Sequence, residues 1–161
     1  MAQQYPPYIW HNGAIKPWAD ATVHVMAHAL HYGSSVFEGI RCYETDKGPA
    51  IFRLTDHNKR LLHSAKIYDI ALPYSLDDIN AACRAVVKAN AFKQCYLRPV
   101  AFRGLGGFGL SAQTPTDVAV ACWDMGAYLG AGVLAPGIDA CVSSWPRFAP
   151  HPIPAGATAG G

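Results

Sequence analysis

The sequence predicts an α+β domain, and three observations support this fold class. Segments rich in β-branched and aromatic residues come first, two amphipathic helical segments follow, and two further strand-like segments come after them. Of the 161 residues, 51% are hydrophobic and 15% are charged, which is typical of a packed globular protein. The length suits one ordinary domain together with a fragment of a second one.

Two β-hairpins are expected near the N-terminus. Residues 8–11 and 14–18 flank the dipeptide Asn12-Gly13, which favours the two positive-φ positions of a type I′ turn. The β-rich runs 36–43 and 50–54 are separated by polar residues that are typical of a turn. We therefore expect these two runs to pair as the second hairpin.

Two helices are expected next. Residues 55–67 place apolar side chains on one face at helical spacing. In the second helix Ser75 is the expected N-cap, Asp77 and Asp78 occupy the first turn, and the apolar stripe continues to Asn90. Both helices can therefore cover a sheet.

The remaining elements are two strands and a connection to a second domain. Residues 95–102 and 118–123 read as buried strands that a glycine-rich loop joins. We expect a small domain over residues 1–124, an interdomain loop over 125–136, and the truncated start of a larger, cofactor-binding domain over 137–161. Within that last part, residues 138–144 are the expected first strand.

Composition narrows the classes of function. A net charge of +2, with basic residues scattered along the chain, argues against nucleic acid as a partner. The N-terminus has no signal-peptide pattern and no apolar run has membrane-spanning length, so a cytoplasmic protein is expected. The five cysteines include no CxxC pair and are expected to be reduced core residues: Cys42, Cys83, Cys95, Cys122 and Cys141.

Two local patterns suggest binding sites that their surroundings do not support. His24, His28 and His31 would share one face of a helix, as zinc ligands can, but the segment is β-branched and leads towards a strand. Gly104, Gly106 and a third glycine match GxGxxG, but no helix follows to bind a pyrophosphate. We expect no metal site and a flexible loop.

Two arginines are candidates for anion binding. Arg98 lies beside Tyr96 in an apolar predicted strand, where a guanidinium is costly unless an anion or a carboxylate meets it. Arg98 could pair with a nearby acidic side chain, or it could present its donors to a substrate carboxylate beside the Tyr96 hydroxyl. Arg60, on the first helix, would by itself be an ordinary solvated charge.

The chain resembles the N-terminal half of bacterial branched-chain amino-acid aminotransferases, pyridoxal-phosphate enzymes of class IV and fold type IV, in four stretches: VHVMAHALHYGSSVFEGIRCY, HNKRLLHSAKIY, YLRP and GAYLG. The resemblance covers the chain from about Tyr8 to Gly161. It implies amino transfer between leucine, isoleucine or valine and 2-oxoglutarate. A D-amino-acid aminotransferase, an aminodeoxychorismate lyase and a non-catalytic dimerisation or binding module are the alternatives, and GIRCY and GAYLG favour the branched-chain group over the first two.

The resemblance also implies roles for individual residues. Arg60 matches the arginine that grips the cofactor phosphate. Tyr96 and Arg98 match the pair that recognises the substrate carboxylate, while Phe37 and Gly39 match residues that line the pocket for the branched side chain.

Further residues match parts of the site that depend on other segments. Tyr32 and Leu110 look like residues lent to the neighbouring subunit across a homodimer formed by the small domain. Tyr128 falls in the interdomain loop that covers the substrate in this family.

The segment HPIPAGATAGG, residues 151–161, resembles the family's active-site segment with one substitution. Thr158 occupies the position of the Schiff-base lysine, and a threonine hydroxyl cannot form an imine with the cofactor aldehyde. The last lysine in the chain is Lys93. The family's carboxylate for the pyridine nitrogen would lie beyond Gly161, so this chain alone is expected to be catalytically incompetent.

Overall fold

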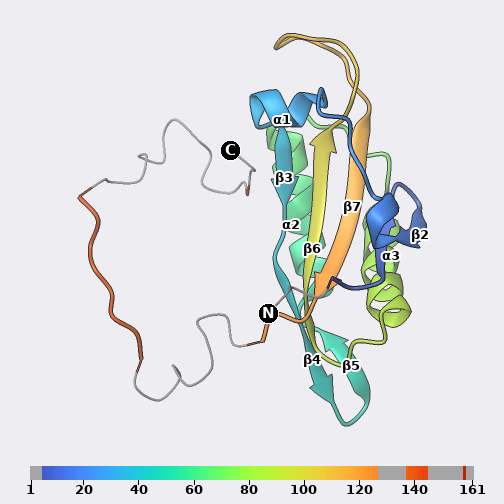
Figure 1. Cartoon of the computed structure of the whole chain (residues 1–161), viewed down its shortest axis with the longest axis vertical. Helices are drawn as coiled ribbons and strands as arrows, with labels where there is room; N and C mark the ends of the chain where they lie inside the picture. Colours follow the sequence, from blue (N-terminus) through green and yellow to red (C-terminus); the bar gives the residue numbers. More distant parts are fainter. Residues whose placement is uncertain (1–4, 127–136, 145–157, 159–161) are drawn as a thin grey trace.

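An antiparallel sheet forms the centre of the protein. The computed structural model describes residues 5–126, 137–144 and 158, and in this part seven strands form one sheet in the order β2-β1-β7-β6-β4-β5, with β3 also paired to β6 (Figure 1). The strands are β1 (Tyr8–His11), β2 (Ala14–Pro17), β3 (Ser35–Phe37), β4 (Ile40–Thr45), β5 (Gly48–Ile51), β6 (Cys95–Arg103) and β7 (Thr116–Trp123).

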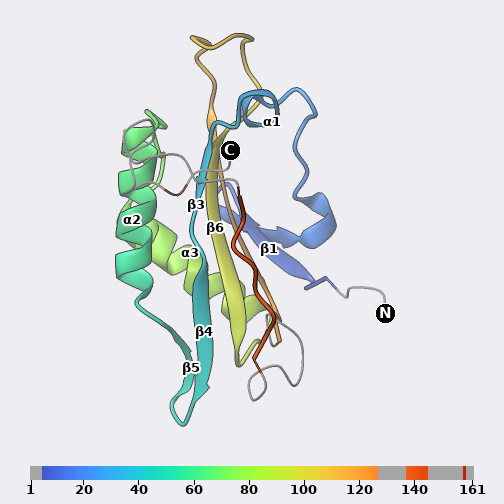
Figure 2. The ribbon, with the colours of Figure 1, turned by 90° about the vertical axis from the view of Figure 1, so that its left-hand side faces the viewer.

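Two long helices cover one face of this sheet. They are α2 (Leu54–Ile67) and α3 (Leu76–Ala89), and a short helix, α1 (His28–Tyr32), lies at one end of the sheet (Figures 1 and 2). A single 3-10 turn, η1 (Trp18–Asp20), follows β2. The α+β fold class predicted from the sequence is therefore confirmed.

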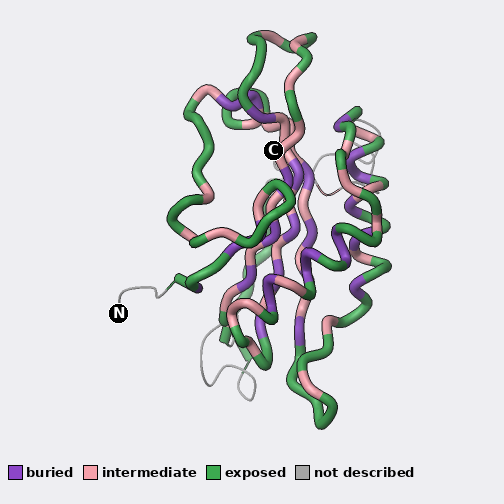
Figure 3. Tube along the Cα trace, turned by 90° about the vertical axis from the view of Figure 1, so that its right-hand side faces the viewer, coloured by how far each residue is buried: buried purple, intermediate pink, exposed green. Residues whose placement is uncertain are grey.

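The hydrophobic core lies between the sheet and the two helices. Along β6, buried residues alternate with partly exposed ones because successive side chains of a strand point to opposite faces. Buried positions run through the strands and the inner faces of α2 and α3 (Figure 3). The fully buried members of this core include Val36, Ile40, Leu61, Ile79, Val86, Leu97, Val118 and Val120.

The first hairpin has the predicted register. Asn12 and Gly13 have φ values of 48° and 93°, as a type I′ turn requires. The Asn12 side chain also binds β7, since its Nδ2 donates to Asp117 (2.7 Å) and its Oδ1 accepts from the Val118 amide (2.8 Å). The turn therefore closes the hairpin and fixes it to the neighbouring strand.

The second long helix begins as predicted. The Ser75 hydroxyl accepts a hydrogen bond from the Asp78 amide (3.2 Å), and the Asp78 carboxylate accepts one from the Ser75 amide (2.9 Å). This reciprocal pair is a capping box, which satisfies two main-chain donors at the start of α3.

The expected strand 36–43 is interrupted. Glu38 and Gly39 separate β3 from β4, although both strands pair with β6. The Glu38 amide donates to the Pro99 carbonyl (2.9 Å), and its side chain is fully buried. The expected strand 50–54 is observed as β5, Gly48–Ile51, which begins two residues earlier and ends before Arg53, the N-cap of helix α2.

Two further expectations differ from the structure. Residues 28–32 form the short helix α1, although the sequence argued against a helix in this segment, and Gly33, at φ 64°, ends it. Residues 137–144 form no strand; Val142 is fully exposed, and a strand without a packed neighbour is not stable by itself. Cys141 is exposed, whereas the other four cysteines are buried as predicted.

Candidate functional site

The structure brings together four of the residues that the resemblance singled out. Phe37, Gly39, Tyr96 and Arg98 lie on β3, β6 and the short break after β3. Arg98 donates from Nη2 to the Tyr96 hydroxyl (3.0 Å), and its guanidinium carbon lies 4.4 Å from the centre of the Phe37 ring. Because Leu97 points into the helix-covered core, Tyr96 and Arg98 point to the opposite face of the sheet.

Gly39 makes room for the Tyr96 phenol. A Cβ atom at position 39 would lie 2.1 Å from Tyr96 Oη and 3.0 Å from its Cζ, which is closer than real Cβ contacts allow. The Tyr96 ring also lies against Trp123, with ring centres 5.0 Å apart. The missing side chain at Gly39 therefore fixes where the Tyr96 hydroxyl sits beside Arg98.

Arg98 has no acidic partner among the residues that the structure describes. Its Nε is buried and makes no hydrogen bond there, while the guanidinium stacks on Phe37 and Tyr96. Of the two alternatives left open by the sequence, the internal ion pair is therefore not observed in this part of the chain. An unpaired guanidinium beside a phenol suits an incoming carboxylate.

Arg60 lies on α2 and binds a different group. Its Nε and Nη2 donate to the two carboxylate oxygens of Glu38, at 2.5 and 2.6 Å. His57 Nδ1 lies 2.9 Å from one of the same oxygens. Burial by itself would raise the pKa of Glu38, but the hydrogen bonds from Arg60 and His57 outweigh it and hold this pKa below its ordinary value.

Thr158 is hydrogen-bonded through its main chain to both β3, which carries Phe37, and α2, which carries Arg60. The Phe37 amide donates to the Thr158 carbonyl (3.1 Å), and the Thr158 amide donates to the Ser64 hydroxyl (3.1 Å). Residue 158 is therefore hydrogen-bonded to both β3 and α2. The position that resembles the family's lysine therefore has Phe37 on one side. On the other side it has α2, the helix that carries Arg60.

Tyr32 and Leu110 form a separate group at the α1 end of the molecule. The Tyr32 hydroxyl accepts a hydrogen bond from the Gly109 amide (3.3 Å), which ties α1 to the loop that carries Leu110. Tyr32 is 45% exposed and Leu110 is 83% exposed. Tyr128, the remaining predicted site residue, lies outside the described residues.

The three histidines have separate hydrogen-bond partners. His28 bonds to the Ser34 hydroxyl (2.7 Å) and the Gly109 carbonyl (3.1 Å), His24 accepts from the Met26 amide, and His31 contacts the Val25 carbonyl. Across residues 5–126, 137–144 and 158, no three histidine, cysteine or acidic side chains are grouped as metal ligands would be. The glycine-rich segment after β6 is a loop and is followed by β7.

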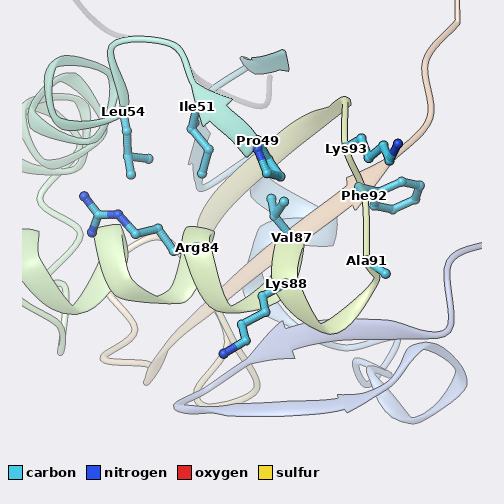
Figure 4. A pocket seen from close by; sticks show the side chains of 9 residues that line it. All are labelled: Pro49, Ile51, Leu54, Arg84, Val87, Lys88, Ala91, Phe92 and Lys93. Atoms are coloured by element: carbon cyan, nitrogen blue, oxygen red, sulfur yellow. The ribbon is translucent and has the colours of Figure 1, made fainter. Parts of the chain in front are cut away.

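A hollow of about 550 Å³ lies elsewhere, between β5 and α3. Its walls are apolar, with Ile51, Leu54 and Val87 among them, and basic side chains stand at its edge. Figure 4 shows that Arg84 and Lys88 point in different directions instead of converging on one ligand. It contains none of the residues that the sequence analysis selected.

Some residues of the candidate site were not predicted. Glu38 contacts Arg60, Ser64 contacts Thr158, and His57 contacts Glu38, but these three residues carry no role in the sequence analysis. Glu38 had a visible signal, because an acidic residue within the apolar run VFEGI needs a cationic partner when it is buried.

In the described part of the chain, no helix is both long enough and apolar enough to cross a membrane.

Comparisons with known proteins place these features in one family. The family model for class IV aminotransferases matches residues 35–154. The chain is 52% identical to the branched-chain-amino-acid aminotransferase of Escherichia coli K12, over 100% of this chain and 53% of that protein. The chain thus spans about half the length of the curated relatives it matches.

Solved structures agree with the sequence comparison. A crystal structure of the Escherichia coli branched-chain amino acid aminotransferase matches with a TM-score of 0.93 and 52% identity, over 96% of this chain and 52% of that chain. The branched-chain amino acid aminotransferase of Thermobaculum terrenum, in its PLP-form, matches with a TM-score of 0.68 and 30% identity, over 79% and 43% of the two chains. The fold is that of the N-terminal part of these proteins.

Proposed function

The chain belongs to the class IV aminotransferase family and corresponds to the N-terminal half of a branched-chain aminotransferase, and from this premise we propose that it carries the substrate side of that enzyme's site. The reaction is amino transfer between leucine, isoleucine or valine and 2-oxoglutarate. The observation that carries this proposal is the group formed by Phe37, Gly39, Tyr96 and Arg98 on the face of the sheet opposite the helices.

Arg98 and Tyr96 bind the substrate carboxylate in this proposal. The unpaired guanidinium supplies donors in a planar fork, and the neighbouring hydroxyl orients it. Phe37 covers one side of the guanidinium and offers an apolar surface to a branched side chain. Gly39 keeps that surface free of a side chain of its own.

The class IV family uses pyridoxal phosphate, and the residues present fit its phosphate group. A guanidinium has five N–H donors, and Glu38 occupies two of those of Arg60. The other three remain for a phosphate, and the Arg60 side chain is 53% exposed. When bound, the cofactor supplies the ring that accepts electrons from the substrate.

Tyr32 and Leu110 are proposed to complete the site of a second subunit. Both are exposed on the isolated chain, next to the exposed apolar residues Leu30, Leu105 and Phe108. An apolar surface of this kind is typical of a protein interface. A homodimer through this end of the small domain and a cytoplasmic location remain predictions.

Thr158 is proposed to remove the covalent step. The main-chain bonds to Phe37 and Ser64 support its assignment to the lysine position. A threonine hydroxyl neither forms an imine nor acts as a base at neutral pH, so this residue can neither anchor the cofactor nor carry its proton. We therefore propose that the 161-residue chain does not transaminate by itself.

The proposal is tested by titrating the chain with pyridoxal phosphate, reducing with borohydride and mapping any adduct by mass spectrometry. Thr158→Lys should gain a reducible adduct at residue 158, and Thr158→Arg, which adds a cation that cannot bond covalently, should not. The unchanged chain should show no stoichiometric adduct.

Two outcomes would contradict the proposal in different ways. A stoichiometric adduct on one lysine of the unchanged chain would show that another residue has taken over the anchor. Absence of an adduct at residue 158 in Thr158→Lys would contradict the proposal that the residues of this chain bring the cofactor aldehyde to position 158. The relatives named above favour branched-chain substrates over D-amino acids, and a binding module without chemistry would give no adduct in any variant.

A further inference from the structure

Glu38 is the charged residue that the core holds most completely. Its side chain is 0% exposed, it lies in the break between β3 and β4, and its amide is bonded to β6 through Pro99. A buried carboxylate is costly unless it is paired and hydrogen-bonded. Its position is therefore fixed by the main chain on one side and by its partners on the other.

Glu38 binds only one edge of the Arg60 guanidinium. Nε and Nη2 of Arg60 each donate to one carboxylate oxygen, so the pair is bidentate. His57 Nδ1 lies 2.9 Å from the oxygen that Nη2 also contacts. Both oxygens of the carboxylate are thus engaged, and α2 is tied to the β3–β4 break at two points.

Among the described residues, no hydrogen bond is made to the other edge of the guanidinium, which can therefore bind a second group. Nη1 and the second hydrogen of Nη2 form another planar pair of donors. A hollow of about 210 Å³ lies beside this side chain, lined by Arg53, Asp56, His57 and Arg60. Within the described residues, Asp56 is bonded to Arg53 and makes no ion pair with Arg60.

This arrangement distinguishes two roles for Glu38. A flexible surface carboxylate would compete with a phosphate for Arg60, whereas a carboxylate enclosed by the core cannot move away and binds the opposite edge. Holding a long side chain in one orientation before binding lowers the entropy lost on binding. The geometry therefore favours orientation over competition.

We propose that Glu38 is a positioning residue that holds the inner edge of the Arg60 guanidinium so that the outer edge is presented to a phosphate group. This inference rests on the proposed phosphate role of Arg60. It adds a function for a residue that does not itself touch the cofactor.

The test uses nitrogen-15 NMR of the arginine side chains in the full 161-residue chain. Arg53 is an internal control, because its Nε donates to the exposed Asp56 at 2.7 Å. We expect the Arg60 Nε–H to exchange with water at least about tenfold more slowly than the Arg53 Nε–H. Equal exchange rates would overturn the inference without any substitution.

The second part adds inorganic phosphate and then pyridoxal phosphate. Phosphate should shift the Arg60 Nη signals while the Nε–H stays protected. In Glu38→Gln the affinity for phosphate should fall by about threefold to tenfold, whereas Glu44→Gln, which removes a carboxylate from an exposed pair with Lys93, should leave it unchanged.

The outcomes separate the inference from the proposed function. If phosphate shifts no Arg60 signal in the unchanged chain, the phosphate role of Arg60 fails and the inference fails with it. If phosphate binds Glu38→Gln as tightly as the unchanged chain, or more tightly, only the positioning role is wrong. Loss of Nε–H protection on adding phosphate would show displacement of Glu38 and would also refute it.

Discussion

The two faces of the sheet differ most clearly at neighbouring residues of β6. Leu97 is fully buried between the sheet and the helices, while Arg98 points the other way and stacks on Phe37 with no acidic partner among the described residues. One face is closed by packing and the other carries unpaired donors and aromatic rings. The packed core and the proposed binding face are therefore separated by a single step along the chain.

Glu38 and Arg60 qualify this separation. Their ion pair lies on the helix side, yet Arg60 remains half exposed and keeps free donors. In the proposal above, the helix-covered face would thus contribute this cation to an anion site at its edge. The following predictions test how far the division between the faces holds.

The largest effect is expected at Leu97. Leu97→Ala should lower the free energy of unfolding by about 2–5 kcal/mol, because it leaves a cavity in the closed core. Arg98→Met should change it by no more than about 1 kcal/mol, because the loss of stacking and of the hydrogen bond to the Tyr96 hydroxyl is offset by removal of a buried Nε that has no partner among the described residues. Urea unfolding of both variants measures the difference, and equal losses would remove the distinction between the faces.

A smaller, pH-dependent effect is expected at Glu38. Glu38→Gln should cost about 1–3 kcal/mol at pH 7, because buried partners lose a charged acceptor. The pKa of Glu38 is lowered in the folded state, so its contribution is present above the ordinary value of 4.5 and is lost as the pH falls through the folded value.

The stability gap between Glu38→Gln and the unchanged chain should therefore close on acidification below pH 4.5. Urea unfolding over a pH series measures it. Glu44→Gln, at an exposed pair, should differ from the unchanged chain by less than about 1 kcal/mol throughout. A gap at Glu38 that is constant with pH would indicate that packing alone, and not the carboxylate charge, matters there.

Gly39 should give the next effect. Gly39→Ala must displace the Tyr96 phenol and should destabilise the fold by about 1–3 kcal/mol. Adding Tyr96→Phe should recover part of this loss, because the hydroxyl is the nearest atom to the new methyl group. Thermal unfolding of the two single variants and the double variant gives the coupling; strictly additive effects would contradict the contact.

The smallest perturbation is a labelling measurement that leaves the sequence unchanged. Cys141 is exposed and should react quickly with a thiol reagent, whereas the four buried cysteines should react only as the fold opens. Burial also raises the pKa of Cys42 and of Cys83 to about 11, which keeps these two as unreactive thiols at neutral pH. More than one fast thiol would mean that the core face is less closed than described.

Local signals predicted the parts of the fold that local interactions determine. Asn12-Gly13 specified a turn, and Ser75 with Asp78 specified a helix start, because each of these motifs is completed within four residues. The break between β3 and β4 was not predicted, because the residues that account for it lie far along the chain. Tyr96 occupies the space beside Gly39, and Arg60 binds Glu38. The strand expected at 138–144 has an apolar pattern, but residues 137–144 are exposed and form no strand.

In the candidate site, too, the sequence indicated single residues but not the contacts between residues that are far apart along the chain. The sequence identified Arg98 as a cation that needed a partner, but it could not decide between an acidic residue and a ligand. Only the pairing of β3 with β6 places Phe37 over that guanidinium. Glu38 stands out as an acidic residue in an apolar run, but its pairing with Arg60 was not predictable, because a 22-residue separation along the chain gives no periodic signal.

The tethers at position 158 have an evolutionary consequence. Both are made by main-chain atoms, from the Phe37 amide to the carbonyl and from the residue 158 amide to Ser64. Any amino acid except proline can supply that amide and carbonyl. If position 158 is the anchor position, as proposed above, a substitution there would change the chemistry without removing either of these two hydrogen bonds, and selection for folding alone would not act against it.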